Sequence, residues 1–221
     1  MSYRGLKIAL AAKFNTSYHR TGIGLAEGLE QLGCDVSRVD LRTRSWQHWS
    51  GRSLARRLGS AARGADVVLS YKAAELTPAV IAESKGQSRA LWVNWFPDSP
   101  HLLDVALTNS AGYDRCFLFD SSMVDRLRAA GRPAEFLPLG FDPAGIGVPQ
   151  LCDAKADIAR SFVEDEEIGL FRSGEELRAK AEALLSDARW RHGVAERGRQ
   201  RALGEHTWRA RLAELLGRVL R

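Results

Sequence analysis

The residues best suited to chemistry follow an apolar run in the stretch Arg89–His101, which reads RALWVNWFPDSPH. Its first half has the continuous apolar character of a buried strand, and Pro97 and Pro100 then end the regular structure. Asp98 and His101 follow, a carboxylate and an imidazole that can take up or release a proton. In an open α/β sheet, ligands bind beyond the carboxyl ends of the strands. The stretch therefore predicts a ligand-binding site just beyond the end of this strand.

Four residues of this stretch are expected at the rim of a cleft and not in the core: Asn94, Trp95, Asp98 and His101. A purely structural reading also fits, in which Asp98 caps the next helix and Trp92 and Trp95 pack in the core. An upstream insertion, RTRSWQHWSGRS, offers Trp46 and Trp49 as faces on which a sugar or base could stack. The same two rings could equally cover an apolar patch under a long loop.

Hydrophobic patterning places the stretch within a series of alternating strands and helices. Six segments read as strands: Lys7–Phe14, Asp35–Leu41, Asp66–Tyr71, the run from Ala90 to Val93, Tyr113–Asp120 and Glu135–Leu139. A two-glycine turn, Thr21–Gly24, opens the helix between the first two strands, and Gly33 ends it. Because strand–helix–strand crossovers force parallel pairing, the pattern predicts a doubly wound parallel sheet, a Rossmann-like α/β fold.

The chain is expected to contain a Rossmann-like domain at residues 1–143, a linker at 144–156 and a mainly helical segment at 157–221. The linker is rich in Gly and Pro and lacks periodicity. Beyond it only Ile168–Arg172 resembles a strand, which we expect to be isolated or at a sheet edge. A capping box, Ser173–Glu176, opens the first of three amphipathic helices. We expect all three to pack back on the first domain.

Composition excludes several classes of protein. Of the 221 residues, 45% are hydrophobic and 27% charged, as in an ordinary globular protein. No apolar run approaches the roughly 18–20 residues that span a bilayer, and the N-terminal apolar patch, interrupted by Lys13, reads as a strand and not as a signal peptide. The three widely spaced cysteines, Cys34, Cys116 and Cys152, favour a reducing, cytoplasmic location over a disulfide framework or a structural zinc site.

The net charge of +5 is concentrated near the C-terminal end. Residues 189–221 hold nine arginines against Glu196, Glu205 and Glu214. Such a basic helical end can touch anionic lipid head groups or nucleic acid, although it is more often a solvated helix face. We expect at most a weak contact with an anionic membrane, and no nucleic-acid partner.

Motifs for metal and cofactor chemistry are missing from the sequence. It has no HExxH, no DxD and no cluster of Cys and His, and His192 and His206 stand fourteen residues apart without partners. It also has no GxSxG elbow and no Walker loop. We therefore expect neither a metal nor a bound cofactor.

The C-terminal part resembles the end of a GT-B glycosyltransferase. The runs DIARSFVEDEEIGLFRSGEEL and AERGRQRALGEHTWRAR are similar to the CgeB-like (spore maturation protein) family, which is related to glycosyltransferase families 1 and 4. The family's G-R-x-R and H-T motifs are matched by Arg197-Gly198-Arg199 and by His206-Thr207-Trp208. NWFPDSPH resembles a loop of its first domain, and FLPLGFDP resembles its passage between domains.

The resemblance implies metal-independent transfer of a sugar from a nucleotide-sugar donor to an acceptor. The site residues it implies are a catalytic base among Asp98, His101 and His19, a phosphate-binding turn of Thr21, Gly22 and Gly24, and a substrate cleft with Asn94, Trp95 and Asp142. The chain departs from the family after FLPLGFDP, where most of the donor-binding half of the second domain is missing. We therefore expect weak or lost activity. The alternative is a non-catalytic remnant that binds a nucleotide, sugar or protein, with homodimerisation covering its exposed face.

Overall fold

The computed structural model describes residues 3–14, 20–42, 51–86, 88–98, 100–140 and 147–221. The chain divides into two compact units. Met1–Gly140 and Trp208–Arg221 form the first unit, and Phe141–Thr207 forms the second. The end of the chain therefore folds together with its beginning.

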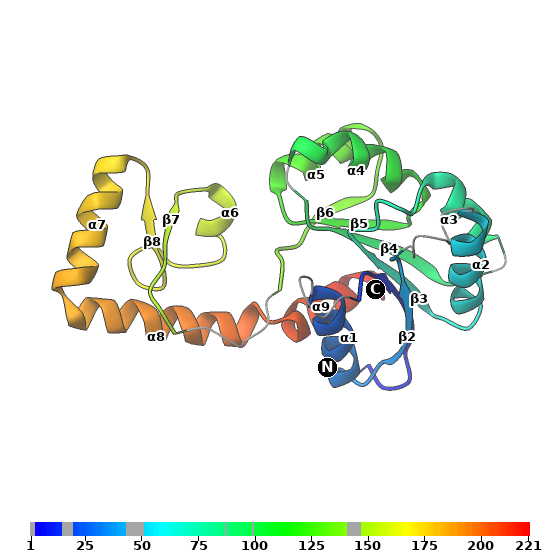
Figure 1. The fold of residues 1–221 in the computed structure, drawn as a ribbon, viewed down its shortest axis with the longest axis horizontal. Coiled ribbons are helices and arrows are strands. Elements are labelled where there is room, and N and C mark those ends of the chain that lie inside the picture. The colour runs from blue at the N-terminus through cyan, green and yellow to red at the C-terminus, as the bar shows by residue number, and fades with distance from the viewer. Residues whose placement is uncertain (1–2, 15–19, 43–50, 87, 99, 141–146) are drawn as a thin grey trace. The chain divides into compact units, whose positions relative to one another are not determined.

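The first unit is built on a six-stranded parallel sheet (Figure 1). Its strands are β1 (Lys7–Ala12), β2 (Asp35–Asp40), β3 (Val67–Tyr71), β4 (Leu91–Phe96), β5 (Arg115–Leu118) and β6 (Ala134–Phe136). They lie in the order β2-β1-β3-β4-β5-β6, and every neighbouring pair is parallel. The central strands are almost wholly buried and apolar, because helices cover both faces of the sheet.

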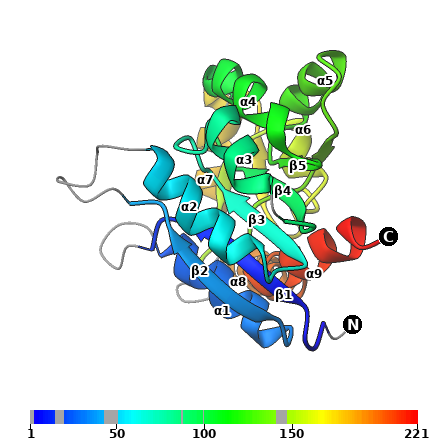
Figure 2. The ribbon, with the colours of Figure 1, turned by 90° about the vertical axis from the view of Figure 1, so that its right-hand side faces the viewer.

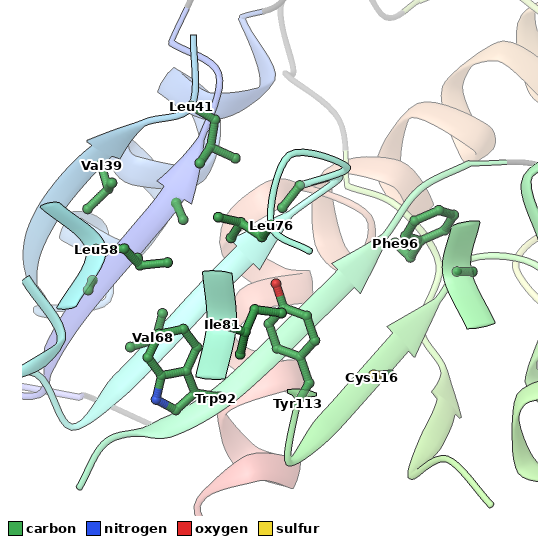
Figure 3. Close-up of a cluster of buried hydrophobic side chains, with 14 of the residues drawn as sticks. Val39, Leu41, Leu58, Val68, Leu76, Ile81, Trp92, Phe96, Tyr113 and Cys116 are labelled. Carbon is green, nitrogen blue, oxygen red and sulfur yellow. The ribbon is translucent and has the colours of Figure 1, made fainter. Parts of the chain in front are cut away.

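Two hydrophobic clusters lie on the two faces of this sheet. One cluster joins the sheet to α1 (Thr21–Gln31) and to the last helix, α9 (Trp208–Val219), which lie side by side (Figure 1). The other joins it to α2 (Gly51–Ala62), α3 (Pro78–Lys85), α4 (Leu103–Asn109) and α5 (Ser121–Ala129), with α2 and α3 seen in front of the strands in Figure 2. Figure 3 shows part of this second cluster, where Trp92 and Ile81 pack together. The predicted doubly wound α/β sheet is confirmed.

In the part that the structure describes, the second unit contains a small parallel pair of strands and three helices. Its elements are β7 (Leu151–Asp153), α6 (Ala156–Ala159), β8 (Gly169–Phe171), α7 (Gly174–Ser186) and α8 (Ala188–Glu205). β8 lies within the predicted strand Ile168–Arg172, but it is not isolated because it pairs with β7. β7 was not predicted, since its three residues fall in the segment expected to be a linker and are too few for a periodic pattern.

The ends of α7 and α8 follow the sequence signals. The Ser173 hydroxyl accepts a hydrogen bond from the backbone N–H of Glu176 at 3.1 Å, as the predicted capping box requires. The Glu176 carboxylate reaches back to the backbone N–H of Arg172 at 2.7 Å instead of that of Ser173. Asp187 caps α8 by accepting from the N–H of Trp190 at 2.9 Å.

The three C-terminal helices α7, α8 and α9 do not all belong to the same unit. α9 lies in the core of the first unit, as expected, with Leu212, Leu215 and Leu216 fully buried. α7 and α8 belong to the second unit, and their expected packing on the first domain stays a prediction. Within that unit, α7 packs on the strand pair β7–β8. No helix in the described part of the chain is long and apolar enough to cross a membrane.

Candidate functional site

A pocket lies where the chain crosses from one face of the sheet to the other. β1 has β2 on one side and β3 on the other, so the connections that leave β1 and β2 diverge at the carboxyl ends of these strands. Such a switch point is where open α/β sheets bind ligands. The pocket has a volume of about 200 Å³ and is lined by Lys13, Thr21, Gly22, Leu41, Tyr71, Lys72, Ala73 and Glu75. We call it the switch-point pocket.

Two ion pairs set the electrostatics of the switch-point pocket. Lys13 follows β1 and pairs with Glu75, in the loop after β3, at 2.5 Å. Lys72 follows β3 and pairs with Asp98, just beyond β4, at 2.8 Å. The Asp98 carboxylate is only 13% exposed, whereas the Lys72 side chain is 54% exposed. Among the described residues, both lysines of the pocket are thus balanced by a carboxylate.

The backbone at Lys72 is unusual. Its φ of 62° lies in the left-handed region, which few residues other than glycine adopt. Held this way at the end of β3, the lysine reaches the carboxylate of Asp98. Non-glycine residues in this conformation cost free energy and occur often at functional sites.

Tyr71 forms an aromatic wall beneath Lys72. Its ring packs edge-on against Trp95 and Trp208, with centroids 5.9 and 6.0 Å away, and these two indoles contact each other at 5.7 Å. Burial, helped by the negative charge of Asp98, raises the pKa of the Tyr71 hydroxyl well above its usual range. Tyr71 therefore stays a neutral hydroxyl at physiological pH.

The residues of the two-glycine turn, Thr21–Gly24, have two different surroundings. Thr21 and Gly22 line the switch-point pocket at the start of α1. Gly22 is needed for close packing, because a Cβ there would lie 2.4 Å from the carbonyl oxygen of Lys13. Gly24 is not among the lining residues, and a Cβ there would lie 2.7 Å from the indole of Trp208. Gly24 therefore serves the packing of α9 on α1, and its expected place in a phosphate-binding turn stays a prediction.

Asn94 and Trp95 do not lie at a cleft rim, which corrects our expectation. β4 continues to Phe96, three residues beyond the predicted end, so both residues lie inside the strand. Trp95 is fully buried and donates from Nε1 to the carbonyl oxygen of Leu137 at 3.3 Å. Asn94 is 5% exposed and lines a cavity of about 10 Å³, the size that holds a single water. The structural reading of Trp92 and Trp95 is the right one.

The candidate bases differ in their position relative to the switch-point pocket. Asp98 lies beside the pocket through its ion pair with Lys72. His101 is exposed in the short 3-10 helix Pro100–Leu102 and is not among the described residues that line the pocket. His19 and Asp142 lie outside the described residues, as do Trp46 and Trp49. The roles expected of all these residues, catalytic for Asp98, His101 and His19, remain predictions.

Of the eight described residues that line the switch-point pocket, sequence reasoning identified only Thr21 and Gly22. Lys13 and Tyr71 were read only as the ends of strands, and Lys72 and Glu75 drew no attention. A signal was available, because all four residues stand at or just after the carboxyl ends of predicted strands on the two sides of the switch point. Ion pairs between loops cannot be read from sequence, since they depend on the strand order.

The C-terminal motif holds a loop against α8 within the second unit. Arg197 donates from Nε to the carbonyl oxygen of Glu166 at 2.9 Å. Arg201 and His206 both donate to the carbonyl oxygen of Ser161, at 3.2 and 3.1 Å. A Cβ at Gly198 would lie 2.3 Å from the carbonyl oxygen of Glu167. The motif therefore has a structural role in this chain.

An ion-pair network fixes the acidic part of the same loop. Glu164 accepts two hydrogen bonds from the guanidinium of Arg172, at 2.7 and 2.8 Å, and a third from Lys180 at 3.2 Å. Lys180 also binds Asp165 at 2.7 Å. Arg172, and then Lys180, lower the pKa of Glu164 to about 2. These acidic side chains are engaged within the unit.

The arginines of residues 189–221 are largely engaged as well. Six of the nine contact carboxylates or carbonyl oxygens: Arg191, Arg197, Arg199, Arg201, Arg211 and Arg218. Arg218, for example, binds the carbonyl oxygen of Phe136 at 2.8 Å within the first unit. These contacts favour the reading of a paired helix surface over that of a free basic face.

Within the described ranges, no group of three or more His, Cys, Asp and Glu side chains is placed to hold a metal ion. The cysteines Cys34 and Cys116 are buried, and Cys152 is partly buried. The polar and aromatic groups that line the switch-point pocket are ammonium, carboxylate, hydroxyl and phenol groups.

Comparison with known proteins gives one family relationship. Residues 126–217 match the family model described as Glycosyl transferase-like, a stretch that runs from α5 through the second unit into α9. The match covers less than half of the chain and supports a glycosyltransferase relationship at a coarse level. No curated protein matches the sequence.

Solved structures that are similar to the chain include two ornithine carbamoyltransferases. One is a mitochondrial ornithine carbamoyltransferase from Coccidioides immitis, at 12% identity and a TM-score of 0.36, covering 98% of this chain and 84% of that one. The other is an ornithine carbamoyltransferase from Burkholderia thailandensis E264, at 16% identity and a TM-score of 0.32, covering 94% and 87%. Likeness at this level carries no argument about function, so the fold assignment rests on the strand order and register of this chain.

Proposed function

We propose that this chain is a glycosyltransferase-like protein of the GT-B, CgeB-like kind that binds a nucleotide sugar and whose transfer activity is weak or lost. The match of residues 126–217 to the glycosyl transferase-like family carries this proposal. The matched stretch ends in α9, whose Trp208 packs on Tyr71 in the wall of the switch-point pocket. The part of the chain that resembles a glycosyltransferase is thus in direct contact with the part that can hold a ligand.

Sugar transfer needs a base at the acceptor hydroxyl and groups that stabilise the leaving diphosphate. Asp98 is our candidate for the base, because it lies beside the switch-point pocket. Lys72 is its positioning residue, since the 2.8 Å ion pair holds the carboxylate in place. A hydroxyl that enters the pocket next to this pair would meet a proton acceptor and a proton donor together.

Weak or lost activity follows from the size of the second unit. Its described residues form one pair of short strands, β7 and β8, whereas the resemblance implies a second Rossmann-like domain with a donor site. Because donor and acceptor must be held in line by both walls of a cleft, an enzyme with a reduced donor wall loses most of its rate. The alternative, a non-catalytic remnant that binds a nucleotide or sugar, rests on the same observation.

The test is a thermal-shift screen against UDP-, GDP- and dTDP-sugars, with hydrolysis of the donor followed in the same samples. We expect at least one nucleotide sugar at millimolar concentration to raise the melting temperature, with little or no turnover. Turnover near 10 s⁻¹, roughly the median for enzymes, would contradict the loss of activity. The absence of a shift with every donor would contradict nucleotide-sugar binding.

A further inference from the structure

The fold pairs the two lysines of the switch-point pocket with carboxylates from distant parts of the sequence. Lys13 and Glu75 come from opposite sides of the switch point, and so do not meet by proximity in sequence. Lys72 reaches Asp98 from a left-handed backbone conformation. Each ammonium group that the structure describes in the pocket therefore has a carboxylate within direct contact distance.

A phosphate group would be poorly accommodated here. A dianion that approaches Lys13 also approaches Glu75, and one that approaches Lys72 also approaches Asp98. Like charges at such distances repel, and the carboxylates are anchored by the fold. The first turn of α1 presents N–H groups that Arg20 does not cap with its side chain, and such groups donate to hydroxyl oxygens as well as to anions.

A hydroxyl-rich, uncharged ligand fits the same groups well. Each sugar hydroxyl both donates and accepts, so it can donate to a carboxylate such as Glu75 and accept from an ammonium such as Lys13. Both partners are partly exposed, at 29% and 45%, so they can contact a ligand without breaking their pair. Tyr71 and Leu41 supply an apolar and aromatic surface for the C–H face of a sugar ring. Such mixed lining of apolar walls and a few polar groups is typical of small-molecule sites.

We propose that the switch-point pocket binds a neutral, hydroxyl-rich group such as a sugar ring, and not a phosphate. Within the proposed function, on which this assignment rests, the pocket is then the place of the sugar acceptor. This replaces the phosphate-binding role that the resemblance implies for Thr21 and Gly22.

The experiment compares neutral glycosides with anions on the ¹⁵N-labelled full chain. Methyl α-glucoside, methyl α-galactoside, methyl α-mannoside and methyl N-acetylglucosaminide are titrated separately, and so are inorganic phosphate and UDP. We expect at least one glycoside to shift the amide signals of Gly22, Lys72 and Ala73 at a concentration at least 10-fold lower than phosphate or UDP requires. If phosphate or UDP shifts these signals at the lower concentration, or if no glycoside shifts them, the proposal is overturned.

A pair of variants tests the charge argument. Glu75→Gln combined with Asp98→Asn leaves both lysines without a charged partner and keeps the size of each side chain. We expect this double variant to bind phosphate at least 10-fold more tightly and the glycoside more weakly than the parent chain. Glu83→Gln, on the exposed surface of α3, is the matched control and should change neither. Unchanged phosphate binding in the double variant would overturn the assignment.

These results separate the pocket from the proposed function. Glycoside binding without any nucleotide-sugar binding would leave the pocket assignment standing and remove the glycosyltransferase proposal. Nucleotide-sugar turnover, with phosphate bound by Gly22 and Lys72, would overturn the pocket assignment and leave the glycosyltransferase relationship standing.

Discussion

At the first turns of α1, Gly24 lies against the indole of Trp208. An added Cβ would lie 2.7 Å from Cδ1 and 3.0 Å from Nε1 of that ring. We expect Gly24→Ala to cost about 1–3 kcal/mol of unfolding free energy through overpacking, partly offset by about 1 kcal/mol of helix propensity. Urea denaturation measures the difference.

Gly64→Ala is the control for this substitution, because a Cβ there would meet nothing within 4 Å. It should leave the denaturation midpoint almost unchanged. A Gly24→Ala chain as stable as the Gly64→Ala chain would show that packing does not require this glycine. A ligand-binding role for the whole TGIG turn would then regain support.

Three buried groups in the first unit predict loss of stability in alkali. Burial raises the pKa of Cys34 to about 11, and that of Cys116 and Tyr113 to about 12. The folded chain therefore binds more protons than the unfolded chain once the pH exceeds about 9, the ordinary value for a thiol. Stability is complete below that pH and falls as the pH rises through 10 to 12.

Denaturation midpoints at pH 7.5 and pH 10.5 test this pH dependence. We expect a lower midpoint at pH 10.5, and a smaller decrease in Cys116→Ala, which removes one of the titrating groups. An equal decrease in the variant and the parent would contradict the contribution of this thiol.

At the scale of elements, α9 is expected to be indispensable to the first unit. Leu212 and Leu216 are fully buried against the sheet and α1. Truncation to alanine should cost about 2–5 kcal/mol at either position, because each leaves a cavity in a packed core. Leu220→Ala, just beyond α9 and 46% exposed, should cost little. Equal urea midpoints for the three variants would contradict the placement of α9.

α8 and the loop before β8 depend on each other. A Cβ at Gly198 would meet the carbonyl oxygen of Glu167 at 2.3 Å, whereas one at Gly204, in the same helix, would meet nothing within 4 Å. We expect Gly198→Ala to destabilise the second unit by about 1–3 kcal/mol. Gly204→Ala should be neutral or slightly stabilising through helix propensity. Amide hydrogen exchange of α7 and α8 measures both, and equal exchange in the two variants would contradict the close contact.

The regular elements of the first unit could be predicted from sequence because their patterns are long. Five or six apolar residues in succession, bounded by turn residues, identify strands such as β1. β4 was predicted too short because Asn94 interrupts its apolar run, although the fold buries that side chain. β7 was missed because three residues carry no period, and its pairing with β8 is a tertiary contact.

The candidate site could be predicted only in part. The position of Asp98 after a buried strand is a local signal, and the structure places this residue beside the pocket. The pairing of Lys13 with Glu75 depends on β1 and β3 being neighbours, which a local pattern does not reveal. Gly24 could not be assigned from sequence either, because its neighbour Trp208 lies at the other end of the chain.

At the scale of the whole molecule, the chain consists of two units with separate stabilising contacts. The first relies on two hydrophobic clusters, and the second relies on the loop contacts of α8 and the network around Glu164 and Lys180. We expect Gly24→Ala to speed hydrogen exchange in the first unit and Gly198→Ala to speed it in the second. Faster exchange throughout the chain in both variants would contradict two separately stabilised units.

The central claim is that a ligand of this glycosyltransferase-like chain is held by the first unit, at the switch-point pocket. The most direct test maps the amide signals of the full chain that shift when the methyl glycoside of highest affinity is added. We predict shifts at Thr21, Gly22 and the segment from Tyr71 to Glu75, with α7 and α8 unchanged. Shifts concentrated in α7 and α8 would contradict the account, because they would show that the second unit holds the sugar.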